Sequence, residues 1–223
     1  MRTTRTTTVH AAAALAAAAA LTLTLTACGS DSGDDGAKPA VEISGGSSKP
    51  GVVLDTPKEK PDLVLTDTEG EEYDFVAETA GKPTLLFFGY TNCPDVCPTT
   101  MSDIAIAKQK LPRAEQEKLQ VVMVSTDPKR DTPKRMGTWL DAQDKDFIGL
   151  TGDFDTVKDA ARSVGVHLEK PVKEKDGSIT VSHGAEVLAY SPKDDKAHVL
   201  YLAGVTADQY AKDMPKLVKG QKP

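Results

Sequence analysis

Two cysteines, Cys93 and Cys97, lie four positions apart in a segment that reads TNCPDVCP over residues 91–98. One turn of the chain would bring their sulfur atoms together, where they could form a disulfide or share a soft metal ion. A disulfide that closes so short a loop constrains the unfolded chain little and would contribute little stability. The spacing therefore favours a redox-active or metal-binding pair, and a permanent structural disulfide is the alternative.

A histidine could complete a metal site of this kind. Two thiolates leave a copper(I) site one donor short, and imidazole is a suitable third ligand. Beyond the N-terminal segment the chain offers His167, His183 and His198. The apolar residues around His198 predict a strand, which favours an ordinary half-buried histidine there. His167 and His183 both lie where predicted elements end, and position alone does not decide between them.

The element before the cysteines gives the strongest structural signal. Residues 84–90 (TLLFFGY) are almost continuously apolar, which predicts a strand buried on both faces. In α/β sheets, the loop after a strand's carboxyl end is a common place for a functional site. Pro98 disfavours a helical conformation at Cys97, so we predict a helix that begins at Pro98 and ends near Pro112. A thiol at that N-terminus should have a lowered pKa.

The rest of the chain alternates between strand and helix patterns after an initial hairpin at residues 62–75. Further strands are predicted at 119–125, 147–150, 179–181, 187–190 and 198–202, and helices at 133–142, 155–164 and 206–218. This order predicts an α/β fold in which helices cover a mixed sheet. Residues 52–219 are long enough to form one such domain.

The third cysteine, Cys28, belongs to a segment typical of exported proteins. Two arginines precede an apolar run over residues 11–25, and the sequence LTAC at 25–28 resembles the lipobox of bacterial lipoproteins. We therefore expect a signal peptide at 1–27, cleavage before Cys28, and lipidation of that cysteine. A secretory signal followed by an incidental cysteine is the alternative.

The segment after Cys28 and the overall charge narrow the function further. Residues 28–51 are rich in Gly, Ser and Pro, which predicts a flexible tether. Together with the lipid, the tether predicts a domain held at the extracytoplasmic face of the bacterial cell membrane. The chain of 223 residues has a net charge of −6, which argues against nucleic-acid binding. Loss of the signal peptide removes arginines but no acidic residue, so the remainder is more acidic still.

Three blocks of sequence resemble the Sco/SenC family of copper-binding, thioredoxin-like assembly proteins. Residues 87–100 (FFGYTNCPDVCPTT) match the family's cysteine motif, and residues 124–133 (VSTDPKRDTP) match a second block. Residues 182–184 (SHG), followed by VLAY at 187–190, represent the histidine block. The resemblance extends over roughly residues 52–219. It implies a thioredoxin-like mixed sheet flanked by helices, with a β-hairpin inserted before the final strand.

The same resemblance implies a set of ligands and a target. It implies that Cys93, Cys97 and His183 bind a copper ion, with Asp127 near them as a weaker, supporting assignment. It also implies delivery of copper to the CuA centre of cytochrome c oxidase subunit II, with other copper carriers or thiol reductases as further partners. One departure is Ser182, because the family often has Asp before the histidine. That exchange removes a supporting carboxylate but leaves the ligand in place.

Two other functions remain open. A thiol-disulfide oxidoreductase, including a reductase of the oxidase subunit II cysteines, would use Cys93 and Cys97 as a redox-active pair. Thioredoxin-type catalysts have two residues between their cysteines, whereas this chain has three. The peroxiredoxin motif Pro-x-x-x-Thr-x-x-Cys is absent, because Tyr90 stands three residues before Cys93. A redox sensor is the third possibility. We expect a metallochaperone rather than an enzyme, and reductase activity on the same target is the alternative.

Overall fold

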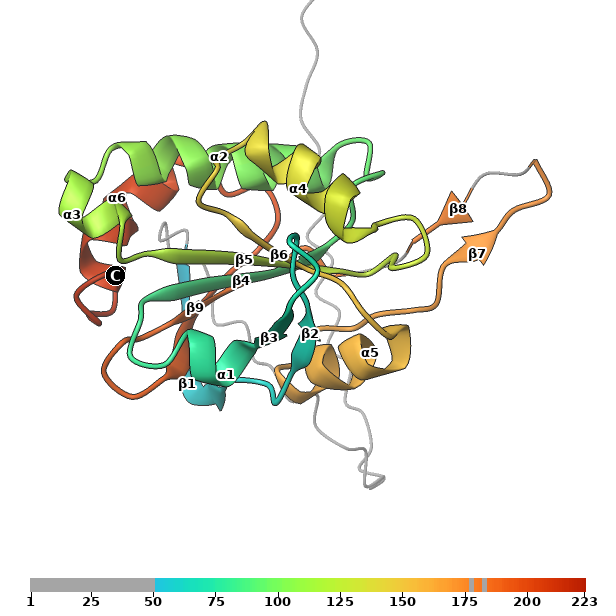
Figure 1. Ribbon diagram of the computed structural model, residues 1–223. Helices are drawn as coiled ribbons and strands as arrows, with labels where there is room; N and C mark the ends of the chain where they lie inside the picture. Colours follow the sequence, from blue (N-terminus) through green and yellow to red (C-terminus); the bar gives the residue numbers. More distant parts are fainter. Residues whose placement is uncertain (1–50, 177–178, 182–183) are drawn as a thin grey trace, which may run out of the picture. The chain divides into compact units, whose positions relative to one another are not determined.

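The computed structural model describes residues 51–176, 179–181 and 184–223 (Figure 1). A mixed sheet at the centre of this part contains β1 (Gly51–Glu59), β4 (Thr84–Gly89), β5 (Gln120–Ser125), β6 (Ile148–Leu150), β9 (Val187–Tyr190) and β10 (Lys196–Tyr201). Its strand order is β1-β10-β9-β4-β5-β6. β5 pairs in parallel with β4 and β6, and the other neighbours are antiparallel. The predicted mixed α/β sheet is confirmed.

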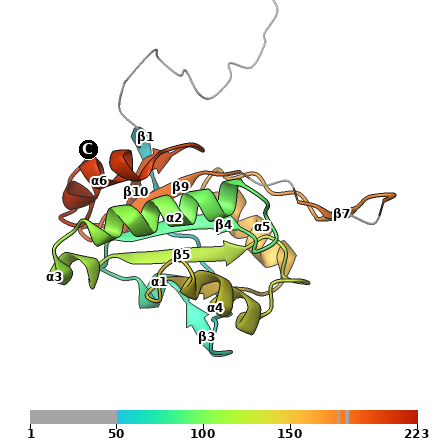
Figure 2. The same ribbon diagram turned by 90° about the horizontal axis from the view of Figure 1, so that it is seen from above.

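Helices cover both faces of this sheet, as Figures 1 and 2 show. One face carries α2 (Val96–Gln109), α4 (Pro133–Asp141) and α6 (Ala207–Leu217), and α3 (Arg113–Gln116) follows α2. The other face carries α1 (Phe75–Glu78), α5 (Phe154–Ser163) and the hairpin of β2 (Val64–Thr66) and β3 (Glu72–Asp74). A second hairpin, β7 (Val172–Lys173) with β8 (Ile179–Thr180), stands between α5 and β9 in the chain. It corresponds to the inserted hairpin that we expected.

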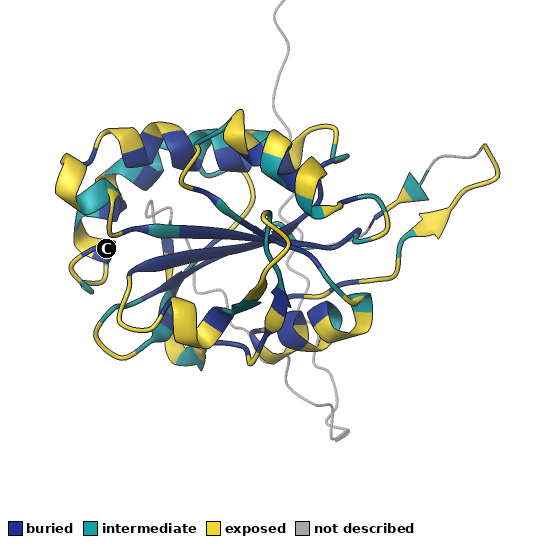
Figure 3. Cartoon of the chain, viewed as in Figure 1, coloured by how far each residue is buried: buried dark blue, intermediate teal, exposed yellow. Residues whose placement is uncertain are grey.

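The central strand β4 explains why its sequence is apolar without alternation. Successive side chains of a strand point to opposite faces. Leu85 and Phe87 belong to the core under α2, α4 and α6, whereas Leu86 and Phe88 belong to the core under α1 and α5. All four side chains are buried, and Figure 3 shows the whole strand in the colour of buried residues. The strand that leads into the cysteines is thus fixed from both sides.

Helix α2 begins two residues earlier than predicted, which corrects our assignment of its start to Pro98. Its N-cap is Asp95, and the N–H of Thr99 makes the first helical hydrogen bond to the Asp95 carbonyl, at 3.2 Å. Pro98 is therefore the third helical residue, where a missing N–H costs nothing because the first turn has no internal acceptor for it. Cys97 lies inside the first turn rather than at its edge.

The edge strand β1 was not predicted, and neither were the single-turn helices α1 and α3. β1 pairs only with β10, and its register shifts between Val53 and Lys58. Most of its side chains are exposed or half-buried, so its sequence lacks a clear apolar alternation. Gly51, expected as the last residue of the tether, is the first residue of β1. The predicted signal peptide and Cys28 lie outside the described residues. No helix within the described ranges is long and apolar enough to span a bilayer.

Candidate metal-binding and redox site

The two cysteines meet in the loop between β4 and α2. The N–H of Cys93 donates to the carbonyl of Tyr90 at 3.2 Å, which turns the chain directly after the strand. The N–H of Cys97 then donates to the sulfur of Cys93 at 3.4 Å, and the two thiols hydrogen-bond to each other. The predicted proximity of the pair is confirmed.

Glycine at the end of β4 is a condition for this packing. A Cβ at Gly89 would lie 2.5 Å from a ring carbon of Phe87, 3.1 Å from the sulfur of Cys97 and 3.2 Å from the methyl carbon of Met123. The first of these distances is too short for any side chain. The absence of a side chain at Gly89 therefore lets the Cys97 sulfur settle against the end of the strand.

The two thiols have opposite pKa shifts, and the shift at Cys97 corrects our expectation. Burial strongly raises the pKa of Cys97, whose side chain is fully inaccessible, and it outweighs the position in the first turn of α2. Cys93 is only half-buried. Partial burial alone would raise its pKa, but hydrogen bonds from the N–H groups of Cys97 and Asp95 and from the Tyr90 side chain lower it overall. Cys93 is therefore the thiol that ionises first.

The hydroxyl of Tyr90 is a hydrogen-bond donor to the sulfur of Cys93. Burial, followed by the nearby Cys93 and Cys97, raises the pKa of Tyr90 to about 12. Its hydroxyl consequently stays protonated at neutral pH and can donate a hydrogen bond to the Cys93 sulfur. Charge-assisted hydrogen bonds of this kind stabilise a thiolate more than a thiol. This role of Tyr90 was not predicted from the sequence.

Asp131 is a second residue that the sequence analysis missed. Its buried carboxylate accepts hydrogen bonds from the N–H of Thr91 at 3.0 Å, from the Thr91 hydroxyl at 2.5 Å and from the Ser125 hydroxyl at 2.8 Å. It thereby joins the cysteine loop to the end of β5. Asp127, expected to support the site, is buried in an ion pair with Arg130. Burial raises the pKa of Asp127 despite the hydrogen bond from that arginine.

A cavity of about 420 Å³ opens at Cys93. One wall consists of Tyr90 and the cysteine loop, and the other of Thr180, Val181 and Ala185. The residues of the second wall stand on both sides of residues 182–183 in the sequence. Ser182 and the expected ligand His183 themselves lie outside the described residues. The cavity brings Val181 and Ala185 to the side of Cys93.

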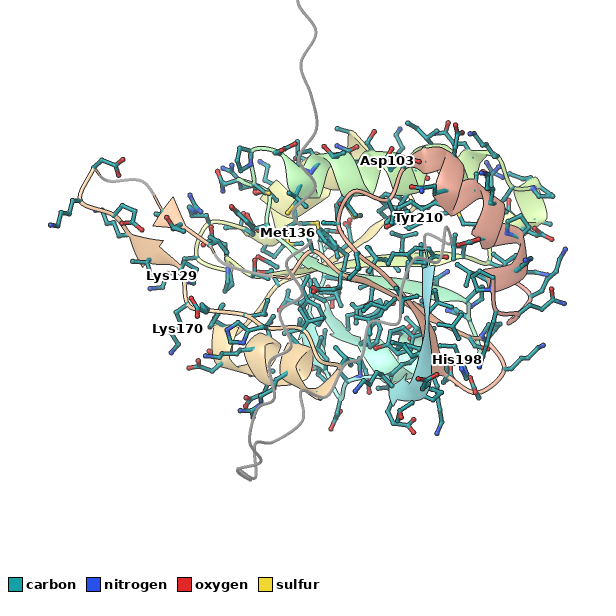
Figure 4. The ribbon with its side chains drawn as sticks, turned by 180° about the vertical axis from the view of Figure 1, so that it is seen from behind. Asp103, Lys129, Met136, Lys170, His198 and Tyr210 are labelled. Carbon is teal, nitrogen blue, oxygen red and sulfur yellow. The ribbon has the colours of Figure 1, made fainter. Side chains whose placement is uncertain are left out.

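The other two histidines lie in different surroundings. The His167 side chain is 81% exposed, with its Nε2 atom 3.4 Å from a carboxylate oxygen of Glu169. His198 is on β10, where its Nε2 atom lies 2.8 Å from a carboxylate oxygen of Asp194. In Figure 4, His198 is far from Lys129 and from the β7–β8 hairpin. Within the described ranges, no three potential ligands among His, Cys, Asp and Glu form a group.

The fold and this loop together define a thioredoxin-like protein whose two cysteines stand between a central strand and the helix that follows it. The family model described as SCO1/SenC matches residues 54–219, and the chain belongs to this family. A protein of Stutzerimonas stutzeri is 37% identical over 143 residues, which are 63% of this chain and 69% of that protein. The mitochondrial protein SCO1 homolog 1 of Arabidopsis thaliana is 34% identical in the matched region. That region covers 51% of this chain and 34% of the length of that relative.

A solved structure supports the same assignment. The structure of Bradyrhizobium japonicum ScoI with copper bound is 32% identical in sequence and superposes with a TM-score of 0.62. The match covers 72% of this chain and 99% of that protein. The expected thioredoxin-like architecture of the Sco proteins is thereby confirmed.

Proposed function

We propose that this protein is an extracytoplasmic copper chaperone that binds copper through the sulfurs of Cys93 and Cys97 and the imidazole of His183. The observation that carries the proposal is the contact between the two thiols at a cavity whose opposite wall includes Val181 and Ala185, which stand on either side of His183 in the sequence. Two thiolates and one imidazole are a donor set suited to copper(I). The copper-bound ScoI structure, from a member of the same family, supports this choice of metal.

The different pKa values of the cysteines suggest how copper is loaded and released. Cys93, at the mouth of the cavity, loses its proton more readily than Cys97, because its pKa is lowered and that of Cys97 is raised; the proton of Cys97 must be displaced as the metal enters. Because that displacement opposes binding, copper can pass by ligand exchange to an acceptor with softer or more numerous donors. Oxidation of the pair to a disulfide would remove both thiolates, so the redox state of the pair controls loading.

We further propose the target and the location. The acceptor is the CuA centre of cytochrome c oxidase subunit II, in agreement with a family of oxidase assembly proteins. A lipid on Cys28 and the tether over residues 28–51 would hold the domain at the outer face of the cell membrane, near that subunit. Other copper carriers or thiol reductases would supply the metal or keep the pair reduced.

The test is a copper titration of the reduced protein in competition with a chromophoric copper(I) chelator. We expect one copper per chain, and a loss of at least about tenfold in affinity for His183→Ala, because one of three donors is removed. His167→Ala is the matched control and should retain the parent affinity, since that side chain is exposed. Unaltered affinity in His183→Ala would refute the ligand assignment.

The asymmetry of the pair also favours a second function, reduction of a disulfide in the same target. The Cys93 thiolate would attack the target disulfide, forming a mixed disulfide and releasing one target thiolate. Cys97 would then lose its proton and attack the Cys93 sulfur, releasing the second target thiolate. Two electrons thus move to the target, and a Cys93–Cys97 disulfide remains.

Thiol counting on oxidised subunit II tests this second function without copper. The reduced parent protein should generate two target thiols per chain, and Cys97→Ser should accumulate the mixed disulfide through Cys93. Absence of both products would exclude the reductase and leave the chaperone unaffected.

A further inference from the structure

A groove of about 810 Å³ runs along the exposed side of α4 and is distinct from the cavity at Cys93. Its lining includes three cationic side chains and one aromatic side chain, from Arg130, Lys134, Arg135 and Trp139. No acidic residue lines it. Such a surface is unusual in a chain whose net charge is −6.

Of the three cations, only Arg130 is paired with an acidic residue of the same segment. Asp127 and Asp131 alternate with the cations in the sequence, but both carboxylates are buried. Asp127 pairs with Arg130, and Asp131 accepts hydrogen bonds from neutral groups of the cysteine loop and β5. The fold therefore turns the acids inward and leaves Lys134 and Arg135 exposed.

Within the described part of the chain, neither Lys134 nor Arg135 is in an ion pair with a carboxylate. Arg135 instead donates to two neutral oxygens, the Thr91 hydroxyl and the side-chain carbonyl of Asn92, each at 2.8 Å. Buried donor atoms of Asn92 and Arg130 also lack an acceptor among the described residues. The groove thus presents the positive charges of Lys134 and Arg135, neither of which is in an ion pair.

The same contacts place the groove beside the site. Thr91 and Asn92 immediately precede Cys93, so Arg135 connects the groove wall to the cysteine loop. Trp139, the only tryptophan of the chain, lies one helical turn beyond Arg135 and is only partly buried against the core under α2. Arginine and tryptophan are the residues most enriched at the energetic centres of protein interfaces.

We propose that this basic groove is the docking surface for an acidic face of the copper-accepting protein. The inference rests on the proposed function, because ligand exchange requires the acceptor to approach Cys93 directly. Carboxylates that pair with Lys134 and Arg135 would hold the acceptor against the cysteine loop, and Trp139 would supply apolar contact at the same interface. Electrostatic complementarity of this kind accelerates association and fixes the orientation of the partner.

The first test measures association of the purified, copper-loaded protein with the soluble copper domain of oxidase subunit II at low ionic strength. Lys134→Glu should lower the association rate constant at least about fivefold, because a steering charge is reversed. Lys118→Glu is the matched control, since Lys118 is exposed at the opposite end of β5 and the change in net charge is identical. Equal rate constants for the two variants would overturn the proposal.

The second test observes Trp139 directly. Incorporation of 5-fluorotryptophan gives a single ¹⁹F resonance, which should shift when the acceptor domain binds and should stay in place with Lys134→Glu at the same concentration. A shift produced by phosphatidylglycerol vesicles but not by the acceptor would overturn the proposal in favour of a lipid-binding surface.

Copper transfer in the same samples separates failure of this inference from failure of the proposed function. Transfer by the parent protein, with identical rates for Lys134→Glu and Lys118→Glu, would refute the groove and leave the chaperone role intact. Absence of transfer from the parent protein would refute the chaperone role and the docking surface with it. Both lysine variants should bind copper with parent affinity, because neither residue touches the cysteine loop.

Discussion

The two walls of the cavity at Cys93 differ in how firmly the fold holds them. The cysteine loop follows β4, which pairs with strands on both sides and is buried throughout. The facing wall adjoins the β7–β8 hairpin, whose strands are two residues long and pair only with each other. Val172 of this hairpin is 55% exposed, whereas every residue of β4 is buried.

This difference matches the chemistry that we propose for each wall. Two thiols must stay together to share a metal or to form a disulfide, and the buried contacts of β4 and Asp131 enforce that proximity. A third ligand that takes part in copper exchange benefits from a segment with few packing contacts, because local opening then costs little free energy.

The largest effect is expected for Asp131→Asn. The amide cannot accept all three hydrogen bonds from Thr91 and Ser125, so buried donors lose their acceptor. We expect a loss of about 3 kcal/mol in the free energy of unfolding, measured by urea denaturation of the reduced protein. Asp141→Asn, at the exposed end of α4, should change it by less than about 0.5 kcal/mol. A stable Asp131→Asn protein would contradict the role of this carboxylate.

A smaller loss is expected for Gly89→Ala, which crowds Phe87 and the Cys97 sulfur. Overpacking of this kind typically costs about 1–3 kcal/mol. Gly137→Ala provides the opposite control, because the nearest atom to its added Cβ is 3.4 Å away, on Thr68, and alanine favours the helix. We expect thermal denaturation to show a lower midpoint for the first variant and an equal or higher midpoint for the second. Equal midpoints for the two variants would argue against close packing at Gly89.

The alkylation rates of the two thiols should depend differently on pH. Because the thiolate is the reactive form, the lowered pKa of Cys93 moves its alkylation by iodoacetamide to a lower pH than for an ordinary thiol. The raised pKa of Cys97 keeps that thiol protonated and unreactive through neutral pH. At pH 7, peptide mapping should find Cys93 modified at least about tenfold faster than Cys97. The reverse order would show that burial does not control the pair.

The smallest effect on stability is expected in the hairpin. Val172→Thr should change the free energy of unfolding by less than about 0.5 kcal/mol, because the side chain is largely exposed. Val122→Thr in β5 should cost about 2 kcal/mol, because it buries a hydroxyl where a methyl group packed. Hydrogen exchange should also be faster at Lys173 than at Phe87. Comparable losses of stability in the two variants would contradict the proposed difference in packing between the sheet and the β7–β8 hairpin.

The sequence predicted the elements whose side chains are buried in a regular pattern. Residues 84–90 were recognisable as a strand because both of its faces pack against helices. β1 was not recognisable, because its exposed edge carries no alternation and its partner β10 lies far along the chain. The start of α2 was predicted two residues too late. Proline disfavours a helical conformation in the residue before it, and this rule was applied to Cys97. Pro98, however, lies in the first turn of the helix, where proline is tolerated.

The proximity of the two cysteines was predictable from the sequence, but their pKa values and the carboxylate that holds their loop were not. The spacing of Cys93 and Cys97 indicated that the sulfurs meet, and they do. The pKa of Cys97 was predicted in the wrong direction, because burial depends on contacts with β4 and α2 that no local motif reveals. Asp131 was overlooked because its partners come from two separate loops. His183 as the third ligand stays a prediction.

X-ray absorption at the copper edge tests most directly whether the two walls together form one metal site. Parent protein loaded with one copper(I) should show two sulfur neighbours and one nitrogen neighbour, and His183→Ala should keep both sulfurs and lose the nitrogen. A histidine nitrogen that persists in His183→Ala, or a parent spectrum with sulfur ligands alone, would contradict the account.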